Sequence, residues 1–116
     1  MQINPVSTGL NGLDEILTGL HLGDNVVWQV DSEEDYRLFA RAFAARALAD
    51  GRRLIYMRFA EHAPILDEDE RIQRCELSAA SGFELFSQEI YTIATREGRE
   101  AFYVFDCLSD LLSAWA

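Results

Sequence analysis

Apolar positions recur with helical spacing in two long segments of the chain. The first follows Ser32, a candidate N-cap, and ends before Gly51, which can adopt the left-handed conformation that stops a helix. Its core-facing stripe consists of Tyr36, Phe39, Ala40, Phe43, Ala44, Ala47 and Leu48. The second segment runs from Ser81 to Glu97, and its stripe consists of Phe83, Phe86, Ile90, Ile93 and Ala94. Both patterns predict amphipathic helices that pack on a core.

Four short segments are rich in β-branched and aromatic residues and are bounded by turn residues, which predicts strands. They are Asn25–Val30, Arg53–Phe59, Ile72–Leu77 and Ala101–Phe105. A shorter helix is expected within Ser7–Leu22, starting at Asn11 or Gly12 and stopping at Gly19, with one face made of Leu13, Ile16, Leu17 and Leu20. A further helix is expected to begin with Leu108, Leu111, Leu112 and Trp115.

The alternation of strands with helices predicts an α/β fold whose crossovers are right-handed. We expect three layers, with a mostly parallel sheet between flanking helices, in a single domain over residues 1–116. The apolar stripe that starts at Leu108 reaches the last residue. We therefore expect the chain to be an N-terminal fragment of a longer protein.

The charge of the chain excludes several kinds of chemistry. Its 116 residues carry a formal net charge of −10, and all ten basic residues are arginine because the chain has no lysine. A Schiff-base mechanism, a lysine base and a lysine-bearing phosphate loop are excluded within this chain. Nucleic acid and anionic membranes bind basic surfaces, so we expect neither as a partner.

Two cysteines and an acidic run bear on the redox state of the protein and on metal binding. Cys75 and Cys107 lie in apolar or strand-like contexts without metal-site spacing, which predicts reduced thiols in a cytoplasmic protein. The run Asp67–Glu70 lacks the spacing and the turn glycine of an EF-hand, so we expect a solvated loop and no metal. The alternative is a small-molecule or cation sensor that uses this loop.

The segment from Ser7 to Asp24 reads Ser-Thr-Gly-Leu-Asn-Gly-Leu-Asp-Glu-Ile-Leu-Thr-Gly-Leu-His-Leu-Gly-Asp. It resembles the opening of KaiC-like and RadA-like members of the RecA family, where it precedes the phosphate-loop strand. The segment Phe102–Ser109 resembles the family's Walker B strand with its terminal aspartate, here Asp106. Glu61 stands where the family keeps its catalytic glutamate. The resemblance implies a truncated RecA-like fold of the P-loop NTPase type.

The chain departs from the family where phosphates bind. In gapless register, the first and last glycines of the loop fall on Val30 and Asp35, its lysine on Tyr36 and its hydroxyl residue on Arg37. The replaced loop consists of Val30, Asp31, Ser32, Glu33, Glu34, Asp35, Tyr36 and Arg37. A phosphate loop needs glycines whose backbone N–H groups surround the anion and a lysine that reaches the outer phosphates. Since four carboxylates occupy the place, we expect no nucleotide and no other cofactor.

The replacement has two interpretations. The carboxylates and Ser32 satisfy the free N–H groups of the helix start in place of a bound phosphate, or they are ordinary helix-start residues. Asp106 ends a buried strand, and we expect it to hydrogen-bond the turn that follows it. Glu61 and His62 are expected to be solvated, and no catalytic residue is expected in the chain.

The whole sequence resembles the N-terminal region of proteins related to phosphoenolpyruvate synthase and pyruvate phosphate dikinase. In these proteins a KaiC-like segment without its phosphate loop precedes the PEP/pyruvate-binding, ATP-grasp part. The resemblance implies a parent phosphotransferase that uses ATP and pyruvate. It also implies that these residues form a non-catalytic interaction or regulatory module, with the other domains of the parent as partners. The alternative is a nucleotide-binding ATPase with an atypical phosphate loop, in which Arg37 replaces the lysine.

The resemblance also raises a question about sheet closure. In the family, the strand after Walker B inserts between the phosphate-loop strand and the Walker B strand, and this chain ends before it. Either Ala101–Phe105 pairs directly with Asn25–Val30, or a neighbouring chain fills the gap. Because an exposed apolar edge favours association, we expect a homo-oligomer, including one formed by strand exchange.

Overall fold

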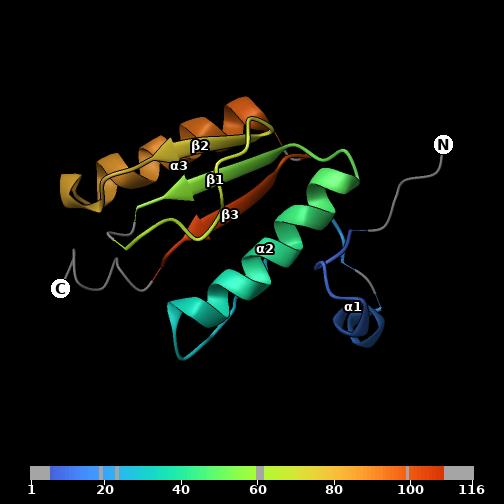
Figure 1. Cartoon of the computed structure of the whole chain (residues 1–116). Helices are drawn as coiled ribbons and strands as arrows, with labels where there is room; N and C mark the ends of the chain where they lie inside the picture. The colour runs from blue at the N-terminus through green and yellow to red at the C-terminus, as the bar shows by residue number, and fades with distance from the viewer. Residues whose placement is uncertain (1–5, 19, 23, 60–61, 99, 109–116) are drawn as a thin grey trace.

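The computed structural model describes residues 6–18, 20–22, 24–59, 62–98 and 100–108. Its helices are α1 (Asn11–Leu17), α2 (Glu33–Ala49) and α3 (Phe83–Glu97), and a 3-10 turn, η1, covers Ala79–Ser81. Its strands are β1 (Leu54–Arg58), β2 (Ile72–Glu76) and β3 (Phe102–Asp106). Figure 1 shows the order of these elements along the chain.

The three strands form one parallel sheet in the order β2-β1-β3. Leu54 at the start of β1 is aligned with Ile72 on one side and with Phe102 on the other. All five residues of β1 are buried, as expected for a central strand with both faces covered. The parallel α/β class predicted from the alternating pattern is confirmed.

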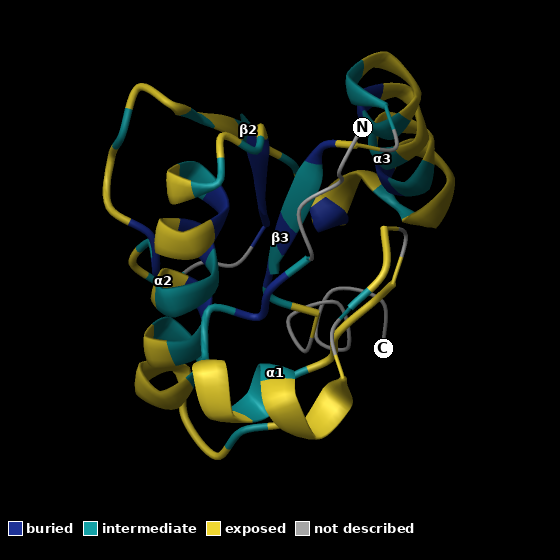
Figure 2. Cartoon of the chain, turned by 90° about the vertical axis from the view of Figure 1, so that its right-hand side faces the viewer, coloured by how far each residue is buried: buried dark blue, intermediate teal, exposed yellow. Residues whose placement is uncertain are grey.

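The sheet is covered by a helix on each face (Figure 1). On one face, α2 contributes Ala40 and Ala44 to a core cluster that also holds Tyr56 and Val104. On the other face, Ile93 of α3 packs in a cluster with Ile55, Met57 and Ala101. Figure 2 shows the buried residues of α2 and β3 turned toward each other. The two amphipathic stripes therefore bury as predicted, because alternate residues of β1 face opposite helices.

The prediction of a strand at Asn25–Val30 is wrong. These residues have no regular secondary structure, and the side chain of Val27 is largely exposed. Within the segment, the Trp28 ring stacks on Phe39 of α2 with 4.2 Å between the ring centroids. Direct pairing with Ala101–Phe105 is also wrong, because Asn25–Val30 is not a strand and the described sheet consists of β2, β1 and β3. A strand-forming composition needs a strand edge beside it, and here the segment packs on a helix side chain instead.

The outer edge of β3 has no strand partner among the described residues. Phe102 N–H donates to Arg53 O at 2.8 Å, and Asp106 O accepts from Phe59 N–H at 2.9 Å. Since a parallel strand alternates its hydrogen bonds between its two sides, the backbone groups of Tyr103 and Phe105 face outward. This edge is referred to below as the β3 edge.

The first helix is shorter than predicted. It ends at Leu17, and Thr18 follows in the left-handed conformation with φ of 56°. No residue of α1 is buried, so the expected apolar face does not form part of the core. Leu20 lies beyond the helix, in an isolated antiparallel bridge with Val6. The expected stop at Gly19 lies outside the described residues.

The Ser-Thr-Gly segment before α1 has a structural role. The Thr8 N–H and hydroxyl donate to Asp14 Oδ1 at 2.8 and 2.6 Å, and the Ser7 hydroxyl donates to Asp14 Oδ2. Burial opposes ionisation of the Asp14 carboxyl, but these hydrogen bonds outweigh it and lower its pKa. Gly9 has φ of +92°, and a Cβ there would lie 2.3 Å from Ala42 O. The motif therefore fastens the N-terminal segment against α2.

Three further observations concern the C-terminal residues, the cysteines and the length of the helices. Of the helix expected from Leu108, residues 109–116 lie outside the described part of the chain. Among the described residues neither Cys75 nor Cys107 is in a disulfide, and both are half-buried rather than fully buried. Among the described residues, no helix has the length and apolar content needed to span a membrane.

Candidate functional site

The carboxyl ends of β1 and β3 meet the N-terminal turn of α2 at one end of the sheet (Figure 1). In open α/β sheets, ligands bind at the carboxyl edge of the strands. The segment Val30–Arg37 lies here, and its residues from Asp31 to Asp35 are solvent-exposed. The Ser32 hydroxyl accepts a hydrogen bond from Asp35 N–H at 3.3 Å, which confirms Ser32 as the N-cap of α2.

Tyr36, in the first turn of α2, connects this helix to β3. Its hydroxyl donates to Phe105 O at 2.7 Å, on the β3 edge. Burial and the nearby Asp106 carboxylate raise the pKa of the Tyr36 hydroxyl, so it stays protonated and remains a donor at neutral pH. Tyr36 is therefore a neutral side chain engaged in an internal contact.

Asp106 is completely buried and is held by two side chains of β1. Its Oδ2 lies 3.0 Å from Arg58 Nη1 and accepts a hydrogen bond from the Tyr56 hydroxyl. The same hydroxyl accepts from Ile65 N–H at 3.1 Å. Burial and the hydrogen bond to Asp106 raise the pKa of Tyr56. The aspartate contacts the neighbouring strand, and because residues 109–116 lie outside the described part of the chain, the hydrogen bond to the turn after β3 stays a prediction.

His62 lies between two carboxylates and is not the solvated residue that the sequence predicts. Its Nε2 is 3.0 Å from Asp106 Oδ1, and its Nδ1 is 3.0 Å from Glu33 Oε2 in the first turn of α2. The Nδ1 atom is also 2.8 Å from Ala63 O. The His62 side chain is only 21% exposed. Asp106 Oδ1 has no aligned hydrogen bond among the described residues, so its contact with His62 is one of distance and charge.

Glu33, Arg58, His62 and Asp106 are called the charge cluster below. They come from α2, β1, the segment after β1, and β3. Breaking one partner of a buried ion pair costs about 3–5 kcal/mol, whereas the intact pair contributes little net stability. The Tyr56 hydroxyl beside the cluster donates to Asp106 and accepts from Ile65 N–H. The contacts of the charge cluster connect α2, β1 and β3 at one end of the sheet.

Arg37 does not form the ion pair with Glu33 that a four-residue spacing allows. Its Nε lies 3.9 Å from Glu34 Oε1, while Glu33 contacts His62. This Nε is buried and has no hydrogen-bond partner among the described residues. The whole side chain is 22% exposed. Arg37 is therefore a cation near the helix start that internal contacts leave incompletely satisfied.

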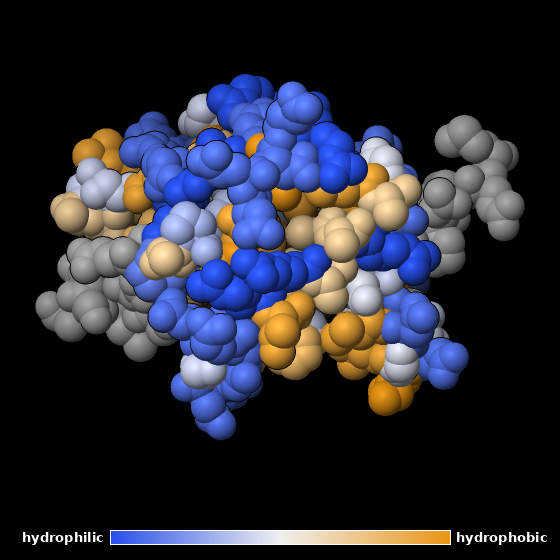
Figure 3. All heavy atoms as spheres, viewed as in Figure 1, coloured by the Kyte–Doolittle hydropathy of each residue, from blue (hydrophilic) through white to orange (hydrophobic). Residues whose placement is uncertain are grey.

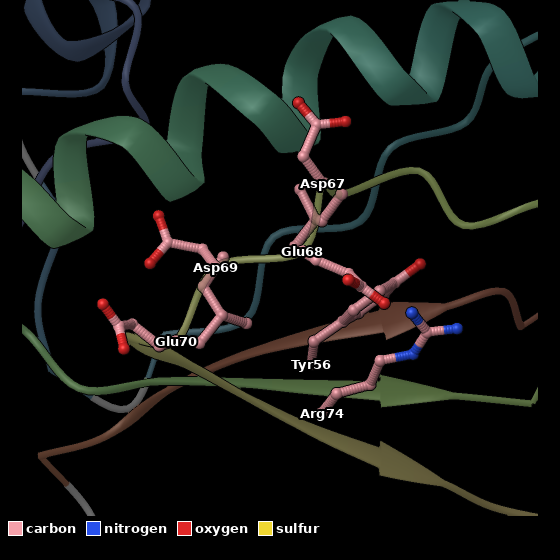
Figure 4. A pocket seen from close by; sticks show the side chains of 8 residues that line it. Tyr56, Asp67, Glu68, Asp69, Glu70 and Arg74 are labelled. Carbon is pink, nitrogen blue, oxygen red and sulfur yellow. The ribbon is translucent and has the colours of Figure 1, made fainter.

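The acidic run Asp67–Glu70 lines an open pocket beside Tyr56 and Arg74 (Figure 4). Asp67 lies 3.0 Å from Arg41 Nη2, and Asp69 lies 2.7 Å from Arg71 Nη2. Hydrogen bonds from Arg71 lower the pKa of Asp69 to about 2. Figure 4 shows the four carboxylates pointing in different directions rather than toward one point. No group of three potential metal ligands occurs among the described residues.

The sequence predicts part of this site. Asp106 is the last residue of β3, as predicted, although that strand is only partly buried. Glu61 lies outside the described residues. Tyr56 and Arg58 were missed as partners of Asp106. Alternation along the predicted strand Arg53–Phe59 places Tyr56 and Arg58 on one face. The sequence alone does not show which strand lies beside that one.

Comparisons with protein-family models, with curated proteins and with solved structures gave no match. The relationship to the RecA family therefore depends on the residues quoted above and belongs to the proposals that follow.

Proposed function

We propose that this chain is a non-catalytic interaction or regulatory module derived from a RecA/KaiC-like ATPase. The Ser-Thr-Gly segment before α1, the parallel α/β fold and the aspartate at the end of β3 support the relationship. The altered loop from Val30 to Arg37 supports the loss of nucleotide binding.

The observation that carries the proposal is the internal use of Asp106. The carboxylate is completely buried, with Arg58 and Tyr56 as hydrogen-bond partners, and Tyr36 bonds Phe105 O from the lysine position. Residues that would face a nucleotide in the family thus make contacts with one another. A nucleotide bound there would have to break these contacts or leave them unused.

Electrostatics favours the same conclusion. Asp31, Glu33, Glu34 and Asp35 surround the start of α2. Each carboxylate repels a phosphate charge about 4 Å away by roughly 1–4 kcal/mol, depending on screening. The helix N-terminus attracts an anion by only about 0.3–1 kcal/mol at an exposed site, so the repulsion exceeds the attraction.

The parent protein is proposed to be a phosphotransferase related to phosphoenolpyruvate synthase and pyruvate phosphate dikinase. In that arrangement the chemistry belongs to the following PEP/pyruvate-binding and ATP-grasp part, and this module contacts the other domains. The support is the resemblance of the sequence to the N-terminal region of such proteins. Reading the parent gene beyond Ala116 tests it, since a gene without an ATP-grasp region downstream contradicts the proposed parent.

Thermal unfolding with Mg-ATP tests the proposed loss of nucleotide binding. We expect the midpoint of the full chain to move by less than about 1 °C at millimolar Mg-ATP. A ligand at one hundred times its Kd stabilises by about 2.7 kcal/mol, a shift on the order of 10 °C. A shift of several degrees would contradict the proposal. Mg²⁺ and Ca²⁺ alone serve as controls, and calorimetric heat with either cation would favour the cation-sensor alternative.

A nucleotide-binding ATPase with an atypical loop is the second candidate, and the unsatisfied Nε of Arg37 favours it. In this alternative, the guanidinium takes the place of the lysine against the outer phosphates. It requires ATP hydrolysis by this module that is lost in Arg37→Ala. Arg41→Ala, on the same helix and paired with Asp67, is the matched control. Equal hydrolysis by both variants would remove this candidate.

A further inference from the structure

Within the described part of the chain, the polar atoms that face the imidazole of His62 are hydrogen-bond acceptors. Its Nδ1 has Glu33 Oε2 at 3.0 Å and Ala63 O at 2.8 Å, and its Nε2 has Asp106 Oδ1 at 3.0 Å. Two of these acceptors are carboxylates on different elements, one in the first turn of α2 and one at the end of β3. The ring therefore lies between two segments that are far apart in the sequence.

The protonation state of the imidazole decides whether both contacts are favourable. A protonated imidazole carries a donor on each nitrogen, whereas a neutral one carries a donor on one nitrogen and a lone pair on the other. In the neutral form, the lone pair must face either the carboxylate of Glu33 or that of Asp106. One of the two contacts then changes from attraction to repulsion.

The neighbouring charged and hydroxyl groups contact atoms other than Asp106 Oδ1. From β1, Arg58 and the Tyr56 hydroxyl are directed at Asp106 Oδ2. From α2, the Tyr36 hydroxyl is directed at Phe105 O, and Arg37 pairs loosely with Glu34. Asp106 Oδ1 is buried without an aligned hydrogen bond, so the cation available to it in the described structure is His62.

We propose that His62 is a pH-sensitive clasp, which fastens the first turn of α2 to the carboxyl end of β3 while its ring is protonated. Loss of the proton releases one of the two carboxylates and loosens that turn. The clasp therefore stabilises the folded chain at acidic pH and ceases to do so as the pH rises. This inference does not depend on the partner of the module or on nucleotide binding.

The first experiment compares the full chain with His62→Gln and His21→Gln from about pH 5.5 to 8.5. Gln is uncharged at every pH, and His21, the other histidine of the chain, is a matched control because its ring is exposed and lies 3.7 Å from one carboxylate, that of Asp24. We expect the thermal midpoint of the unmodified chain to exceed that of His62→Gln by about 4 °C at the acidic end. The difference should approach zero at the alkaline end, while His21→Gln follows the unmodified chain throughout.

A second measurement separates the clasp from a loss of packing. The Tyr36 N–H donates to Ser32 O in the first turn of α2, and its hydrogen-exchange protection reports whether that turn is fastened. We expect this protection to fall as the pH rises in the unmodified chain and to become independent of pH in His62→Gln. Glu33→Gln alters a half-exposed side chain and should weaken the pH dependence without unfolding the chain. A constant difference between the unmodified chain and His62→Gln at every pH, or equal pH dependence in Glu33→Gln, would overturn the proposal.

Discussion

Gly9 lies where the segment before α1 meets the backbone of α2. A side chain at this position would collide with the carbonyl group of Ala42 and would also have to adopt φ of +92°. The resemblance in the sequence marks the glycine as part of a motif, but it does not reveal the role. The structure explains the residue through close approach of two backbones, with Ser7 and Thr8 bonded to Asp14 beside it.

Gly9→Ala is expected to destabilise the chain by about 2–4 kcal/mol, because overpacking and positive φ both oppose the new methyl group. Urea unfolding measures the change. Gly12→Ala is the matched control, since a Cβ at Gly12 meets nothing within 4 Å and alanine favours the helix. Similar losses for both substitutions would mean that the close contact of Gly9 with α2 does not limit stability.

At the level of elements, local signals predicted α2, β1, β2, α3 and β3 close to their observed bounds. The caps, the periodicity and the composition that predict these elements all lie within the segments themselves. The strand predicted at Asn25–Val30 is wrong for a different reason, because strand formation depends on a neighbouring strand that is often distant in the sequence. The same reason explains the incomplete prediction of the charge cluster. Asp106 was recognised within its own strand, whereas Arg58 became its partner only through the register of β1 with β3.

The ion pair between β1 and β3 gives a prediction at this scale. Arg58→Met should destabilise the chain by about 3–5 kcal/mol, since it leaves the Asp106 carboxylate buried without its guanidinium. Arg74→Met removes a more exposed pair with Glu76 and should cost less than about 1 kcal/mol. Denaturant unfolding of both variants measures the two changes in the free energy of unfolding.

Adding Asp106→Asn to Arg58→Met should recover part of the lost stability, because the buried negative charge is then removed. If the two arginine variants lose equal stability, the buried pair has no special importance for the sheet.

For the molecule as a whole, the two sheet edges differ. The edge strand β2 carries Gln73, Arg74 and Glu76, and charged side chains discourage pairing with another chain. The β3 edge carries the apolar run Phe102–Phe105 and, among the described residues, has only the Tyr36 hydroxyl on its outward groups. Figure 3 shows apolar residues gathered on the lower part of the face around α1, and Ile16 of that helix is highly exposed.

These features support the expectation of self-association. We expect light scattering to give a mass above that of the 13.2 kDa chain, increasing with protein concentration. Because each copy carries a net charge of −10, added salt should strengthen the association by screening the repulsion between copies. A mass of one chain at high concentration and high salt would refute the expectation.

The central position of β1 has a consequence for how the chain is made on the ribosome. Its neighbours on both sides, β2 and β3, come later in the sequence, so β1 emerges before either of them. Such non-local pairing is slow, because the intervening chain must be ordered before the contacts form. Arg58 therefore leaves the ribosome without its carboxylate, and only the synthesis of β3 allows the buried charge to be neutralised.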